Sequence, residues 1–142
     1  MIFDFYNAQV GNKTITITKE SIDKEITLGN KNTVDQNKTL ALALFLKINK
    51  DSKSINYSEG IIKSGKKLMT IYHNIGEDEK LIEYSYRIEK LAKEINDYES
   101  VSMAIIQRGT NLSTLGFFDE NYKELQNAKY YTEKITDNNK RH

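Results

Sequence analysis

The stretch that decides the fold is residues 75–97, with the sequence IGEDEKLIEYSYRIEKLAKEIND. Residues 115–137 repeat its plan 40 positions later as LGFFDENYKELQNAKYYTEKITD. Each stretch opens with a large aliphatic residue and a glycine, passes through an acidic cluster, and closes on a similar word, KEIND or EKITD. A fixed period of roughly 20 to 50 residues indicates a repeat protein, in which each unit buries its apolar face against the next.

Apolar residues in both stretches recur at three- and four-residue steps, which predicts amphipathic helices. The acidic runs Glu77-Asp78-Glu79 and Asp119-Glu120 suit the positive N-terminal end of a helix. Gly76 and Gly116 suit the left-handed conformation that commonly closes one. We therefore interpret both acidic runs as helix starts rather than as catalytic or metal-binding carboxylates.

Helices are expected from residue 35 onward. The apolar pattern predicts one over 61–75, one from about 77 to 95, one over 99–115 and one from 118 to about 135. An earlier helix is expected to end near residues 46–49, whose sequence LKIN is similar to EIN at 94–96. Short turns between long helices imply antiparallel hairpins. The predicted fold class is all-α, an antiparallel helix-hairpin array with one repeat domain over 35–142.

The N-terminal segment, residues 1–34, allows two interpretations. Thr14 to Thr18 alternates β-branched residues, which is typical of a strand, with Glu25 to Leu28 as its partner. Alternatively, a short helix carries Ile22 and Ile26 and closes at Gly29.

The segment from Ala104 to Ala128 resembles a tetratricopeptide repeat. The positions that carry the resemblance are Ile105, Arg108-Gly109 in the leucine-glycine place, Leu112, the turn Leu115-Gly116, the aromatic Phe118 and the small residue Ala128. The equivalent positions of the preceding unit, forty residues earlier, include Met69, Tyr72, Ile75-Gly76, Asp78, Leu81 and Ile88. The resemblance covers about residues 58–137, with a partial unit over 36–50, and departs from the family in its 40-residue period and in lacking tryptophan and the closing proline.

The resemblance implies an α-solenoid whose first helix in each unit lines a concave binding groove. The groove residues that it implies are Lys63, Lys66, Lys67, Thr70, His73 and Asn74 in one unit, and Gln107, Thr110 and Ser113 in the next. Lysines at one end and hydroxyl or amide groups at the other suit an acidic peptide or a C-terminal carboxylate. An ordinary solvated helix face is the alternative interpretation of these residues.

Composition excludes several function classes. The chain has no cysteine, so it has no disulfides and no thiolate zinc site. The net charge of +1 gives no general attraction to nucleic acid or anionic membranes. No apolar run approaches a membrane span, no signal peptide is evident, and no catalytic or phosphate-binding motif occurs. We therefore expect a cytoplasmic protein that is not an enzyme and uses no cofactor. We also expect no bound metal, since His73 has no second histidine or cysteine nearby to complete a site.

The predicted function is a protein- or peptide-binding helical repeat module in a bacterial signalling or regulatory system. The alternatives are a structural self-association module, or a fragment of a larger repeat-containing transcription regulator or kinase. The last helix carries Tyr122, Tyr130 and Tyr131 in addition to its inward residues, and the tail from Asp137 to His142 looks too short and polar to cover it. We therefore expect a partner, a second copy of the chain or further residues to cover this flank, and we favour a homodimer through this end.

Overall fold

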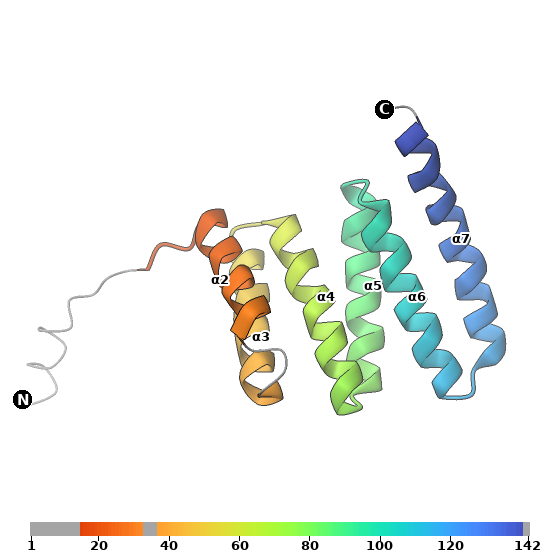
Figure 1. Ribbon diagram of the computed structural model, residues 1–142, viewed down its shortest axis with the longest axis horizontal. Helices are drawn as coiled ribbons and strands as arrows, with labels where there is room; N and C mark the ends of the chain where they lie inside the picture. Colours follow the sequence, from red (N-terminus) through yellow and green to blue (C-terminus); the bar gives the residue numbers. More distant parts are fainter. Residues whose placement is uncertain (1–14, 33–36, 141–142) are drawn as a thin grey trace, which may run out of the picture.

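A computed structural model describes residues 15–32 and 37–140 of the 142-residue chain. In these ranges the chain forms helices only, which are α2 (Lys19–Asn32), α3 (Lys38–Ser54), α4 (Ser58–Ile75), α5 (Asp78–Glu94), α6 (Tyr98–Thr114) and α7 (Phe118–Lys140). Consecutive helices pack side by side, with α2, α4 and α6 in front and α3 and α5 behind in Figure 1. The predicted all-α array of helix hairpins is confirmed.

Four residues with left-handed backbone conformation separate the helices at equal intervals of 20 positions. They are Asn56, Gly76, Asn96 and Gly116, with φ between 53° and 87°. At each turn the next N–H donates back to the carbonyl five residues earlier, as from Glu77 N to Tyr72 O at 2.9 Å. This is the Schellman closure of a helix, which glycine and asparagine adopt most readily. The 40-residue repeat is therefore two helix-turn units of 20 residues each.

This turn spacing corrects the predicted end of α3. The word at residues 46–49 does not end a helix, because α3 continues to Ser54 and closes at Asn56. Asn49 lies buried inside α3, and its Nδ2 donates to the hydroxyl of Ser64 at 2.9 Å and to the carbonyl of Ile61 at 3.2 Å. The residues that correspond to 94–96 are thus 54–56, one 40-residue repeat earlier, and not 47–49.

The predicted end of the last helix near residue 135 is also wrong. Thr136 stands 20 positions after Gly116, where a further left-handed residue would be needed to break the helix. A β-branched residue avoids that conformation, so α7 continues to Lys140. The segment from Asp137 to Lys140 is therefore part of α7 rather than a tail. Tyr131 is half-buried, with its ring 6.1 Å from that of Tyr98 on α6, and does not belong to the outer face of α7.

The N-terminal segment is helical from Lys19, so the strand interpretation is wrong for the residues that the structure describes. Thr14 lies outside them, and residues 15–18 form no strand. Ile22 and Ile26 are buried, as the helix alternative requires, in the same core as α3 and α4. Gly29 does not close α2, because the helix continues to Asn32. A Cβ built on Gly29 would lie 3.0 Å from both Leu44 Cδ2 and Phe45 Cζ. The absence of a side chain at Gly29 lets α2 lie directly against α3.

A buried arginine joins the last three helices. Arg108 on α6 is 1% exposed, although the resemblance places it at a leucine position. Its Nη2 donates to Glu89 of α5 at 2.6 Å, and its Nε and Nη2 each donate to Glu124 of α7 at 2.8 Å. Its guanidinium also stacks on the Tyr86 ring, with 3.9 Å between Cζ and the ring centroid. Lys93 donates to the other oxygen of Glu89 at 2.6 Å, so two cations face two carboxylates.

This cluster shifts the pKa of Glu89. Burial raises the pKa of its carboxyl, but hydrogen bonds from Lys93 and Arg108 outweigh burial and bring the pKa below its ordinary value. Since the folded state holds Glu89 ionised more strongly than the unfolded chain does, this carboxylate adds stability above the unfolded pKa. That contribution is lost as the pH falls through the folded pKa.

None of the helices in residues 15–32 and 37–140 combines the length and apolar character that crossing a bilayer would require.

The left-handed turns predict a residue-specific response at Asn96. Asn96→Val should lower the free energy of unfolding by about 1–3 kcal/mol, because valine resists φ near 58°. Asn96→Gly should stay within about 0.5 kcal/mol of the parent. Urea titration measures both, with Asn127→Val in the middle of α7 as the control for an asparagine-to-valine change. Equal stability of the two Asn96 variants would contradict the turn analysis.

Close packing of α6 on α7 predicts that Gly109 tolerates only a small side chain. A Cβ at Gly109 would lie 2.7 Å from Asn121 Oδ1 and 3.3 Å from Glu124 Cβ. Gly109→Leu should cost about 1–3 kcal/mol from overpacking. Gly109→Ala should cost less, because its gain in helix propensity of about 1 kcal/mol offsets the contact with Asn121. Thermal unfolding measures the stability of both variants. A leucine variant as stable as the parent would contradict the close packing of Gly109 against α7.

The depressed pKa of Glu89 predicts how stability varies with acidity. Glu89→Gln should lower stability at pH 7 by about 1–3 kcal/mol, since the buried Arg108 loses an ionised partner. The deficit should shrink as the pH falls below the ordinary value of 4.5, where the parent carboxylate also becomes protonated. Urea titrations across this range test it, with Glu99→Gln on the exposed start of α6 as control. A deficit independent of pH would contradict the electrostatic role.

Candidate functional site

The predicted groove residues all lie on the two front helices α4 and α6, which contact each other. Seven of the nine line two separate hollows, which we name the lysine hollow and the amide hollow. Asn74 and Ser113 line neither. Asn74 is exposed, and its backbone carbonyl accepts a hydrogen bond from the Lys38 amino group at 3.4 Å.

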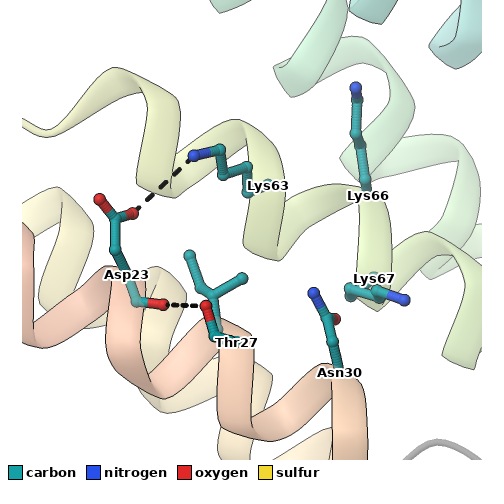
Figure 2. Close-up of a pocket in the computed structure, with 7 residues that line it drawn as sticks. Asp23, Thr27, Asn30, Lys63, Lys66 and Lys67 are labelled. Atoms are coloured by element: carbon teal, nitrogen blue, oxygen red, sulfur yellow. Dashed lines mark hydrogen bonds and ion pairs between the residues drawn. The ribbon is translucent and has the colours of Figure 1, made fainter.

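The lysine hollow lies between α2 and α4 and has a volume of about 570 Å³. Its lining comes from two helices, and Figure 2 shows Asp23, Thr27 and Asn30 on one helix and the three lysines on the other. The α4 side supplies Lys63, Lys66 and Lys67, and the α2 side supplies Asp23, Ile26, Thr27 and Asn30. The predicted lysine trio is therefore brought to one concave surface, opposite a helix that the sequence left undecided.

Asp23 occupies one end of the lysine hollow and engages only one of its lysines. Its Oδ1 lies 3.9 Å from Lys63 Nζ, and both carboxylate oxygens accept a hydrogen bond from the Tyr57 hydroxyl at 3.2 Å. Burial and the hydrogen bond to Asp23 raise the pKa of Tyr57 to about 12, so its hydroxyl remains a donor at neutral pH. Lys63 is thus held at a structural ion pair.

Lys66 and Lys67 make no ion pair with the residues that the structure describes. Both are half-buried on α4, and Figure 2 shows that neither extends toward Asp23 as Lys63 does. Positive charges on a concave, partly desolvated surface attract anions more strongly than fully exposed lysines do. The lysine hollow therefore presents two available cations.

The amide hollow lies where α4 and α6 meet and has a volume of about 190 Å³. It is lined by Thr70, His73, Gln107 and Thr110 around the buried side chain of Leu81 from α5. Gln107 Oε1 is buried there and has no hydrogen-bond partner among the described residues. A buried amide oxygen without a partner costs free energy, so turning the Gln107 side chain toward a hydrogen-bond donor would be favourable.

Sequence reasoning missed the α2 side of the lysine hollow and the apolar base of the amide hollow. Asp23, Thr27 and Asn30 follow one another at four- and three-residue steps, so the helical alternative for the N-terminal segment already placed them on one face. For Leu81 the apolar pattern predicts a core position and nothing about a binding site.

The acidic runs and His73 form no metal site in the part of the chain that the structure describes. Asp78, Glu79, Asp119 and Glu120 lie in the first turns of α5 and α7, as predicted. Within the described ranges no three histidine, aspartate or glutamate side chains gather closely enough to hold a metal ion. His142 lies outside these ranges.

Comparison of the chain with family models, curated proteins and solved structures finds no match. The tetratricopeptide resemblance therefore stays a prediction, and function is inferred from the two hollows.

Proposed function

We propose that this chain is a protein- or peptide-binding module of the tetratricopeptide type, which holds an acidic segment of its partner against α2, α4 and α6. The observation that carries the proposal is the pair Lys66 and Lys67, half-buried in a concave surface and without carboxylate partners among the described residues. A carboxylate bound there would gain charge-assisted hydrogen bonds.

The amide hollow supports binding of an extended chain next to the acidic group. Thr70 lies one helical turn beyond Lys66 on α4, and its hydroxyl donates to the Lys66 carbonyl at 3.2 Å. That donation leaves the Thr70 oxygen able to accept a hydrogen bond. Gln107 also lines this hollow, and its Oε1, which is buried and without a partner among the described residues, becomes a second acceptor when the side chain turns toward the ligand. A peptide offers backbone N–H donors at regular spacing, whereas a free inorganic anion offers none to either acceptor.

The proposal includes a cytoplasmic setting and a role in bacterial signalling, both of which rest on the resemblance and on composition. The proposal is binding without catalysis, and the amide hollow places Thr70, Gln107 and Thr110 beside His73, with no carboxylate among them. Nucleic acid is a poorer ligand, because the near-zero net charge gives little attraction for a polyanion.

Charge reversal at the lysine hollow should strongly weaken the binding of an acidic peptide. We expect Lys66→Glu with Lys67→Glu to weaken binding of a glutamate-rich peptide by more than about tenfold, because two attractive charges become repulsive. The same peptide with glutamine at each glutamate should bind the parent weakly, and binding to the glutamate form should fall as salt rises. Fluorescence anisotropy of labelled peptides measures all three effects.

The matched control is Lys90→Glu with Lys123→Glu, which makes the same change in net charge on α5 and α7. The control should bind the glutamate-rich peptide as the parent does, and both pairs should keep stability within about 0.5 kcal/mol. Equal loss of binding in both pairs would mean that only overall charge matters. Unchanged binding after reversal at Lys66 and Lys67 would refute the lysine hollow as the site.

A further inference from the structure

The outer face of α7 carries a row of large apolar side chains that no described residue covers. Phe118 is 67% exposed, Tyr122 65% and Leu125 44%. They follow one another at steps of four and three residues, and Lys129 continues the row after four more. This is the spacing of the contact line between two paired helices. Lys129 is exposed and has no ion pair among the described residues.

The 40-residue repeat shows what this row corresponds to inside the array. Phe118, Tyr122 and Leu125 stand at the positions of Asp78, Ile82 and Ser85 in α5. There, Asp78 accepts a hydrogen bond from Asn111 at 2.6 Å, and Ser85 accepts one from Arg108 at 3.2 Å, both from α6. Ile82 packs against the core. The positions that α5 uses to receive the next helix are thus apolar and uncovered in α7.

We propose that two copies of this chain pair through α7 in antiparallel orientation, along Phe118, Tyr122, Leu125 and Lys129. A two-fold axis midway between Tyr122 and Leu125 places Tyr122 of one copy against Leu125 of the other. The same axis places Phe118 against Lys129, so that each lysine lies over an aromatic ring of its partner copy. Both pairings are favourable, the first by apolar burial and the second by cation–π attraction.

A second copy fits this row better than a helix of the kind that follows α5. In α5 the position equivalent to Lys129 is Glu89, which receives the guanidinium of Arg108. With lysine there, a helix carrying arginine at that place would meet a like charge. The antiparallel copy offers an aromatic ring instead, and it supplies apolar side chains opposite the two central positions. The row is therefore complementary to itself.

The exposed area fits a weak dimer. Large aromatic side chains cover about 150–250 Å² each, so the three apolar residues expose roughly 300 Å² per copy. Pairing would cover roughly 600 Å² of apolar surface. Because an interface is only a little more than half apolar, the total buried area would be roughly 1,000 Å², which is the size of a weak or transient interface. We expect dissociation in the micromolar range, visible as a dimer that dilution separates.

Sedimentation equilibrium of the full chain over a concentration series tests the pairing. The parent should show a monomer–dimer equilibrium, and Tyr122→Glu should weaken it by more than about tenfold. Tyr130→Glu is the matched control, since Tyr130 is also exposed on α7 but lies about 100° around the helix from the row. Circular dichroism shows whether each variant is folded, and Leu125→Lys serves as a second variant.

Disulfide trapping tests the orientation, because the chain contains no cysteine. A mixture of Tyr122→Cys and Leu125→Cys chains should crosslink between unlike variants faster than either variant does alone. Crosslinking within the Tyr122→Cys sample alone would indicate a parallel pair and overturn the proposal. So would a monomeric parent at high micromolar concentration, a dimer unaffected by Tyr122→Glu, or assemblies that grow beyond the dimer.

Discussion

The structure depends on a backbone constraint that returns every 20 residues. Asn56, Gly76, Asn96 and Gly116 all take left-handed conformations, and each ends a helix with the same pair of backward hydrogen bonds. Because the intervals are equal, α4, α5 and α6 have nearly equal lengths and can pack along their whole extent. Figure 1 shows α2, α4 and α6 in one layer. Residues of this layer line both hollows, with Leu81 of α5 also lining the amide hollow.

Contacts between the helices change in kind along the array. Between α2 and α3, and between α4 and α5, they are mainly apolar, helped by Gly29 against Phe45 and by Gly65 against Ile88. Between α5, α6 and α7 the contacts include a buried cation, since Arg108 of α6 forms ion pairs with Glu89 of α5 and Glu124 of α7. A buried ion pair often adds little stability over an apolar contact, but removing one partner is costly. We infer that the Arg108 cluster fixes the positions of α6 and α7 relative to α5, and so the α6 side of the amide hollow.

The sequence was sufficient for the helices and for much of the front face. The 3.6-residue period, the two glycines and the acidic helix starts are local signals, and each indicated the right element. Asn56 was missed because asparagine is common in this chain, and only the equal spacing with Asn96 shows its role. Thr136 shows the reverse case. The sequence at 133–137 is similar to that at 93–97, but it has threonine where Asn96 takes the left-handed conformation, so the helix continues. The lysines were found because they share one face of a helix, whereas Asp23 and Asn30 required a contact between α2 and α4 that no local pattern reveals. The Arg108 cluster was missed for the same reason, since its partners lie 19 and 16 residues away.

The central claim is that the layer of α2, α4 and α6 is the ligand-binding face. Titration of the ¹⁵N-labelled chain with the glutamate-rich peptide, followed by NMR, tests it most directly because every backbone amide reports separately. We expect the largest shift changes on α4 between Lys63 and His73, on the facing side of α2, and on α6 around Gln107. Shift changes confined to α3, α5 or the outer face of α7, or equal changes with the glutamine peptide, would contradict it.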